Sequence, residues 1–83
     1  MRTAVVGHVE WATFARVDHV PAAGEIVRAG ESWEAAAGGG SVAAVRFAQL
    51  GGDVRFFTAI GDDEAGARAV AELEARGIAV HAA

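Results

Sequence analysis

Two kinds of hydrophobic pattern alternate along this chain: short apolar runs typical of strands and longer stretches typical of helices. Thr3–Val9 and Asp53–Ile60 are apolar runs that contain β-branched or aromatic residues, and each predicts a buried strand. Asp53–Ile60 has so few polar interruptions that we expect a central strand, buried on both faces. The run Ile78–His81 predicts one more short strand.

Two stretches carry the helical pattern. Val42–Leu50 is rich in alanine and apolar over most of its surface, and Ser41 in front of it is a favourable N-cap. Glu64–Arg76 has an apolar stripe on one face, and Gly77 follows where it suits the C-terminal turn of a helix. On the other face we expect a solvated ladder of charges at i, i+4 spacing. Its members are Glu64, Arg68, Glu72 and Arg76.

A long excursion separates the first strand from the first helix. Thr13–Val20 alternates between apolar and polar residues, which predicts a strand that is exposed on at least one face. Pro21–Gly24 supplies the residues of a turn. Glu25–Ala29 and Ser32–Ala37 are two further short extended segments, so the excursion resembles a hairpin.

The order of these elements predicts the fold class. Helices that alternate with buried strands indicate an α/β fold, in which a parallel sheet is joined by right-handed crossovers. The sequence contains no internal repeat, low-complexity linker or second domain.

Composition excludes several classes of function. The chain has 83 residues, a net charge of −4 and no run of basic residues, so we expect no nucleic-acid partner. Without cysteine, disulfides, thiolate metal sites and a cysteine nucleophile are excluded, and without lysine a Walker A loop is excluded. No apolar stretch approaches the roughly 18 residues of a membrane span, and the first residues do not resemble a signal peptide. We therefore expect a cytoplasmic protein with no membrane partner.

The segment Gly38-Gly39-Gly40, directly before Ser41, is the most informative part of the sequence. Glycines allow a backbone to approach a ligand closely, and free amides at a helix N-terminus favour oxyanions or hydroxyl-rich ligands. The alternative is a tight turn into the helix with no ligand, and the segment alone fits both interpretations.

Four segments together resemble the PfkB-type, or ribokinase-like, carbohydrate kinase family. They occur in the family's order and with its usual spacing. The resemblance lies in an opening strand, a lid segment of the form Pro-x-x-Gly-Glu-x-Val, a glycine signature that begins a helix, and a Gly-Asp-Asp-x-x-Gly segment. The corresponding residues are Val5–Glu10, Val20–Val27, Gly38–Val45 and Ala59–Gly66.

The resemblance implies a ribokinase-like three-layer parallel-sheet fold with a small β lid. It implies ATP-dependent phosphorylation, with Mg²⁺, of a hydroxyl group on a sugar, nucleoside or related small molecule. Residues 1–83 would be the N-terminal, acceptor-binding and lid portion of such a kinase. The family's nucleotide-binding and catalytic part carries a Gly-x-Gly-Asp-type motif that is absent here. We therefore expect no catalytic residue in this chain, no activity from it in isolation, and one uncovered, apolar side of its sheet.

The same resemblance implies four substrate-binding residues, Glu10, Gly38, Gly39 and Gly40. Two family residues are missing, because Ala12 stands where an acceptor-binding Asp is common and Ala43 stands where an Asn is common. Glu10 would replace the missing carboxylate, or would be only a solvated residue at a strand end.

Other polar and aromatic residues have structural explanations beside functional ones. Trp11 fits stacking on a sugar or base, and equally a place in the core or an interface. Asp62 and Asp63 precede a helix, which makes N-capping and compensation of the helix dipole the better explanation. The histidines lack the spacing of metal ligands, although one is close to the implied acceptor site, and we assign none of them to a metal. They are His8, His19 and His81.

Two other functions fit parts of the sequence. The segment Gly38-x-Gly40-x-x-Ala43, with Asp62 about 20 residues later, formally matches a dinucleotide-binding fingerprint of the Rossmann type. It does not follow the first buried strand, as that fingerprint requires. A catalytically silent, oligomerising module is the second alternative. The lid could also pair with a second copy, as a homodimer, through Ile26, Val27 and Trp33, or it could be an ordinary sheet face.

Overall fold

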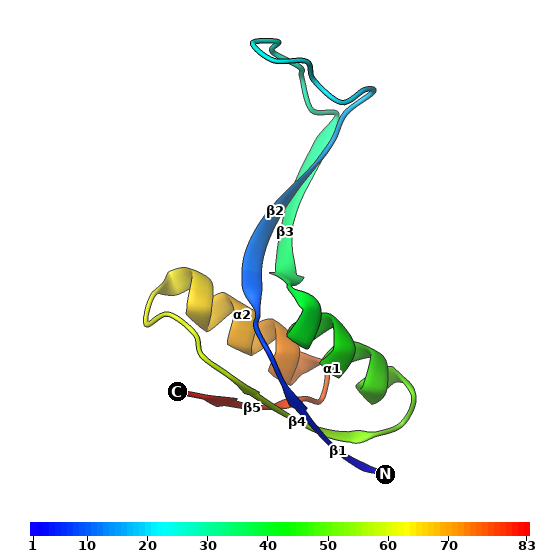
Figure 1. Cartoon of the computed structure of the whole chain (residues 1–83), viewed down its shortest axis with the longest axis vertical. Helices are drawn as coiled ribbons and strands as arrows, with labels where there is room; N and C mark the ends of the chain where they lie inside the picture. The colour runs from blue at the N-terminus through cyan, green and yellow to red at the C-terminus, as the bar shows by residue number, and fades with distance from the viewer.

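The computed structural model describes all residues 1–83, which form a parallel sheet, two helices and a protruding hairpin (Figure 1). The elements in chain order are β1 (Arg2–Val6), β2 (Glu10–Arg16), β3 (Glu31–Ala37), α1 (Gly39–Gln49), β4 (Asp53–Thr58), α2 (Glu64–Ala75) and β5 (Ala79–Ala82). The predicted α/β class is confirmed. Neither helix is long and apolar enough to cross a membrane.

The parallel sheet has the strand order β1-β4-β5, with β4 in the centre. Both crossovers, through α1 and through α2, move in the same direction across the sheet. Crossovers of the same hand then place both helices on one face, as Figure 1 shows. Residues 1–83 therefore form two layers, with the second face of the sheet uncovered.

The core lies between the sheet and the two helices. Phe56 and Val54 on β4 are buried against Leu73, Ile78 and Ala44. The opposite face of β4 is exposed, because no helix covers it. The prediction that this strand is buried on both faces is therefore wrong for these residues.

The uncovered sheet face carries apolar side chains. Val6 on β1 is 81% exposed and Phe57 on β4 is 39% exposed, so the prediction of an open apolar side is confirmed. Phe57 stacks on His81 of β5, with the ring centroids 4.8 Å apart. The prediction that Thr3–Val9 is a buried strand is only partly right, because β1 alternates between half-buried and exposed residues and ends at Val6.

The hairpin consists of β2 and β3, which pair antiparallel from Glu10↔Ala37 to Arg16↔Glu31. Its strands contain no buried residue. Phe14 and Trp33 stack across the pair, with centroids 5.5 Å apart, and the Nε atom of Arg16 lies 2.6 Å from Oε1 of Glu31. Figure 1 shows the hairpin rising away from the sheet and helices.

The hairpin differs from its prediction at the strand ends. β2 covers Glu10–Arg16 instead of Thr13–Val20, and Glu25–Ala29 forms no strand. The predicted turn at Pro21–Gly24 is confirmed, because Gly24 has a φ of 79° and the amide of Glu25 donates to the carbonyl of Ala22.

Both ends of α2 agree with the prediction, whereas the start of α1 does not. Asp63 caps α2 as expected, since its Oδ1 accepts the amide of Gly66 at 2.8 Å. Gly77 has the expected positive φ, 83°. The prediction of Ser41 as N-cap of α1 is wrong, because the helix begins at Gly39 and Gly38 takes the capping position with a φ of 97°. Ser41 lies in the first turn, where its hydroxyl donates to the carbonyls of Ala37 and Gly38.

Candidate functional site

The candidate site lies at the edge of the sheet where the carboxyl ends of the parallel strands meet. β1 and β4 end there, α1 and α2 begin there, and the hairpin rises from the same edge (Figure 1). In open α/β sheets ligands bind outside this edge, because the loops that follow the strands leave a crevice there.

The glycine segment packs directly on the backbone that follows β1. The amides of Gly40 and Ser41 donate to the carbonyl of His8, at 3.1 and 3.3 Å. A Cβ on Gly40 would lie 2.7 Å from that carbonyl oxygen and 2.8 Å from the carbonyl carbon of Gly7, which is closer than real Cβ contacts allow. Gly40 is therefore required so that two backbone segments can touch.

The amides at the start of α1 are not free, so of the two interpretations of this segment the one based on free amides is not supported. Besides the two bonds to the His8 carbonyl, the amide of Gly39 donates to Nε2 of His8 at 3.3 Å, and the amide of Val42 donates to the carbonyl of Gly38. The segment therefore offers a ligand close approach at the exposed Gly39, and no row of unoccupied donors.

His8 contacts the glycine segment through its ring and its backbone, which the sequence did not indicate. Its ring lies against the glycine segment, because a Cβ on Gly38 would be 3.0 Å from its Cδ2 atom. Since Nε2 accepts the Gly39 amide, the neutral ring carries its proton on Nδ1. His8 thus supports the glycine segment through both its ring and its carbonyl. Its position near the end of the first predicted strand, close to the implied acceptor site, was the only sequence signal for this role.

Glu10 lies at the same edge as the glycine segment. It begins β2 opposite Ala37, the residue that precedes Gly38. Its side chain is exposed and forms no hydrogen bond or ion pair with residues 1–83, so the carboxylate is free to accept hydrogen bonds from hydroxyl groups. The structure therefore brings Glu10, Gly38, Gly39 and Gly40 together at the carboxyl edge.

Glu10 also lines a cavity of about 200 Å³ between the hairpin base and the loop before α2. Gly61 and Asp63 form the opposite wall. The carboxylate of Asp63 is engaged as the N-cap of α2, which confirms the capping interpretation for this residue. Residues 1–83 contain no group of three or more His, Asp or Glu side chains that could hold a metal ion.

Trp11 is held in the joint between the hairpin and α2. It is half-buried, and its indole N–H donates to Oε2 of Glu34 at 2.8 Å. Arg68 of α2 reaches the same Glu34 at 3.5 Å and forms an i, i+4 pair with Glu64 at 2.9 Å. These contacts support the structural explanation for Trp11.

Glu72 makes a second tie between α2 and the hairpin. Its Oε2 atom accepts the backbone amide of Ala36 on β3, a contact across 36 residues that the sequence gave no signal for. The predicted charge ladder on α2 is therefore confirmed for Glu64 and Arg68, and wrong for Glu72.

The two alanines at expected polar positions add no hydrogen-bonding side chain. Ala12 pairs with Ala35 inside the hairpin, and Ala43 is half-buried in α1. Among the residues that we expected to bind substrate, Glu10 therefore supplies the only polar side chain.

The tip of the hairpin holds a polar cluster around His19. Its ring nitrogens lie 2.7 Å from Oδ1 of Asp18 and 3.0 Å from Oε2 of Glu25. The amide of Ala22 donates to Oε1 of Glu25 at 2.9 Å, and this bond, followed by the contact with His19, lowers the pKa of the Glu25 carboxyl. The tip is therefore ordered by an ionised carboxylate and not by burial.

Comparisons with known proteins agree on one family. The family model described as pfkB family carbohydrate kinase matches residues 2–82. No curated protein matches the chain.

Solved structures resemble the whole chain. A putative ribokinase from Agrobacterium tumefaciens is 30% identical, with a TM-score of 0.90 over 99% of this chain and 28% of its own. The ribokinase from Thermotoga maritima is 31% identical, with a TM-score of 0.77 over 96% of this chain and 28% of its own. The ribokinase from Cryptococcus neoformans var. grubii serotype A, solved with ADP, is 30% identical, with a TM-score of 0.74 over 95% of this chain and 24% of its own. The chain thus spans less than a third of each of these proteins.

Proposed function

The chain belongs to the pfkB family of carbohydrate kinases, and from this premise we propose that residues 1–83 form the acceptor-binding and lid portion of an ATP-dependent kinase. Its substrate is a sugar, nucleoside or related small molecule with a free hydroxyl group. The ADP in the similar ribokinase from Cryptococcus neoformans supports a nucleotide as phosphoryl donor. Phosphoryl transfer itself is proposed for the protein as a whole, since the similar ribokinases are three to four times as long.

One observation carries the proposal. The free carboxylate of Glu10 and the exposed Gly39 lie at the carboxyl edge of the parallel sheet, where the hairpin begins and ends. A carboxylate without an internal partner can accept hydrogen bonds from sugar hydroxyls, and a glycine backbone lets the sugar ring come close.

Each part then has a distinct task. Glu10 accepts hydrogen bonds from hydroxyls of the acceptor and so orients the one that receives the phosphoryl group. His8 holds the glycine segment in place by accepting hydrogen bonds from its amides. The hairpin closes over the bound acceptor, which excludes water and so suppresses hydrolysis of ATP.

ATP and Mg²⁺ do not fit a site built from these residues alone. No carboxylate cluster is suited to a metal ion, and the first amides of α1 already have partners in His8 and Gly38. We therefore assign no residue of this chain to the nucleotide or the metal, and none to a catalytic step.

The two other functions differ in their support. A dinucleotide site is disfavoured because the glycine segment follows β3, a strand of the separate two-stranded sheet, and not β1 of the parallel sheet. A silent, oligomerising module is an outcome of the test below.

Pairing of the lid with a second copy is supported by Ile26, which is 97% exposed, and by Trp33, which is 45% exposed. A cytoplasmic location stays a prediction.

The test uses the protein expressed from its natural gene, with ATP and a panel of sugars and nucleosides. We expect ATP-dependent phosphorylation of at least one of them. Glu10→Gln should raise the acceptor KM about tenfold or more, because a hydrogen bond to a charged group is lost. Glu74→Gln, on the exposed face of α2, is the matched control and should leave the KM unchanged.

Three results would contradict this proposal or a part of it. Saturable NAD binding without phosphorylation of any panel member would favour the dinucleotide alternative, and neither activity would favour the silent module. An unchanged KM in Glu10→Gln would remove this residue from the site.

A further inference from the structure

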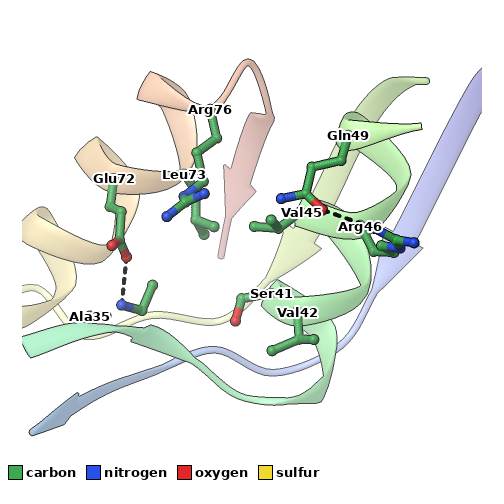
Figure 2. Close-up of a pocket in the computed structure, with 10 residues that line it drawn as sticks. Ala35, Ser41, Val42, Val45, Arg46, Gln49, Glu72, Leu73 and Arg76 are labelled. Carbon is green, nitrogen blue, oxygen red and sulfur yellow. Dashed lines mark hydrogen bonds between the residues drawn. The ribbon is translucent and has the colours of Figure 1, made fainter. Parts of the chain in front are cut away.

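A second cavity, of about 240 Å³, lies between α1, α2 and the end of β3 (Figure 2). None of the residues assigned above to acceptor binding lines it. Its walls are largely apolar and include Val45 of α1 and Leu73 of α2. Cavities of about 150 Å³ with apolar walls take up benzene, so this one has room for an aromatic ring and a substituent.

Hydrogen-bond donors face this cavity from both helices. The Nη1 atom of Arg46 donates to Oε1 of Gln49 at 3.4 Å, which engages the amide oxygen and leaves the amide NH₂ of Gln49 on the cavity side (Figure 2). The guanidinium of Arg76 also lies on the cavity side of α2, and it forms no ion pair with any carboxylate of the chain.

One acceptor of the lining is engaged, because Oε2 of Glu72 accepts the amide of Ala36. The hydroxyl of Ser41 acts as a donor and binds the carbonyls of Ala37 and Gly38. The lining includes two arginines, Arg46 and Arg76, and one carboxylate, Glu72, so it carries a formal excess of one positive charge. The cavity therefore combines apolar walls, unused donors and the charge complement of a monoanion.

We propose that this cavity binds a small carboxylate with an apolar body. Arg76 and Gln49 hold the carboxylate, because a guanidinium presents two parallel N–H groups that match its two oxygens. Val45 and Leu73 pack against the apolar body. A carboxylate suits the site better than a doubly charged phosphate, because Glu72 lines the same space and repels a dianion more strongly than a monoanion. Since Ala36 belongs to the wall, the bound molecule also contacts the base of the hairpin.

The test is calorimetric titration of the protein expressed from its natural gene, without ATP or sugar. Three probes separate charge from apolar contact: benzoate has both, benzamide keeps the ring, and acetate keeps the charge. We expect saturable benzoate binding with a Kd of about 1 mM or tighter, and binding of benzamide and acetate at least tenfold weaker. Because no substrate of the kinase is present, this result is independent of the proposed phosphorylation.

Two variants and one control locate the binding. Arg76→Gln removes the guanidinium, and Val42→Trp fills the cavity mouth, where Val42 is 60% exposed. Each should weaken benzoate binding at least tenfold, whereas Arg28→Gln, an exposed charge in the hairpin loop, should leave it unchanged. Equal affinity for benzoate and benzamide, unchanged binding in Arg76→Gln, or no saturation up to about 10 mM benzoate would overturn the proposal.

Discussion

In the base formed by β1, β4, β5 and the two helices, Phe56 and Leu73 are almost completely buried, whereas the hairpin strands β2 and β3 contain no buried residue. The base is held by the removal of apolar surface from water. The hairpin is held by the backbone hydrogen bonds between β2 and β3, by the stacking of Phe14 on Trp33 and by exposed ion pairs. Each of these contributes little to stability alone. One chain thus contains a scaffold and an element with little buried apolar surface, and the proposed lid role requires such an element.

The two regions meet at two joints of different kinds. At one joint the glycine segment packs on Gly7 and His8, with backbone against backbone. At the other joint the carboxylate of Glu72 accepts the amide of Ala36, and Glu34 links Trp11 to Arg68. We call the first the rigid joint, because its contacts are steric, and the second the polar joint, because it consists of side-chain hydrogen bonds and an ion pair.

Truncation of one aromatic side chain in each region gives the largest expected effect. Phe56→Ala should lower the free energy of unfolding by about 3–5 kcal/mol, because it leaves a cavity in the core. Phe14→Ala removes a stacked but 40% exposed ring, and should cost about 0.5–1.5 kcal/mol. Urea unfolding measures both values. Equal losses would show that the hairpin shares the core of the base.

Two neighbouring glycines test the rigid joint. Gly40→Ala places a methyl group against the His8 carbonyl and should destabilise the protein by about 1–3 kcal/mol. Gly39→Ala is the matched control, since its nearest neighbour would be 3.5 Å away, and it should be neutral or slightly stabilising in a helix. The comparison is made by thermal or urea unfolding, and a harmless Gly40→Ala would refute the close backbone contact.

Glu72→Ala tests the polar joint. It leaves the half-buried amide of Ala36 without its partner and should lower the free energy of unfolding by about 1–2 kcal/mol. Hydrogen exchange of the Ala36 amide should become faster, while exchange in β4 stays slow. Glu72→Gln keeps an acceptor oxygen and should restore much of the protection, whereas Glu74→Ala should change nothing. Unchanged exchange at Ala36 in Glu72→Ala would mean that the hairpin does not depend on this tie.

The smallest effect is expected at the hairpin tip, as a function of pH. The pKa of Glu25 is lowered from its ordinary value of 4.5, first by the Ala22 amide and then by His19. A lowered pKa means that the folded tip favours the ionised carboxylate. Its contribution is therefore present above pH 4.5 and is lost as the pH falls through the lowered pKa. The Ala22 amide shift in NMR spectra should follow this titration, and Glu25→Gln should abolish it. A flat titration would contradict the contact.

The sequence was sufficient for features set by local chemistry. Asp63 caps α2 and Gly77 ends it, because a carboxylate before a helix and a glycine after it act within one turn of the chain. The parallel arrangement of β1, β4 and β5 also followed from the alternation of strands and helices. The family resemblance drew the glycine segment and Glu10 into one implied site, and the register of the hairpin brings them to one edge.

Features that depend on tertiary contacts could not be predicted. Glu72 was assigned to a solvated ladder because its periodicity is that of an exposed face, yet it turns to Ala36, which no local pattern connects with it. The sequence left open whether the amides of Gly39 and Gly40 are free, because their partner, His8, lies about 30 residues away. The burial of β4 was overestimated for a different reason, since an apolar sequence does not reveal that both helices cover the same face.

We propose that the base holds the acceptor while the hairpin closes over it. Hydrogen exchange of the protein from its natural gene, with and without a saturating acceptor that it phosphorylates, tests this most directly. We expect slower exchange in residues 10–40, which include the hairpin and the glycine segment, and unchanged exchange in the central strand β4. Unchanged exchange throughout the hairpin, with an acceptor bound and turned over, would contradict it.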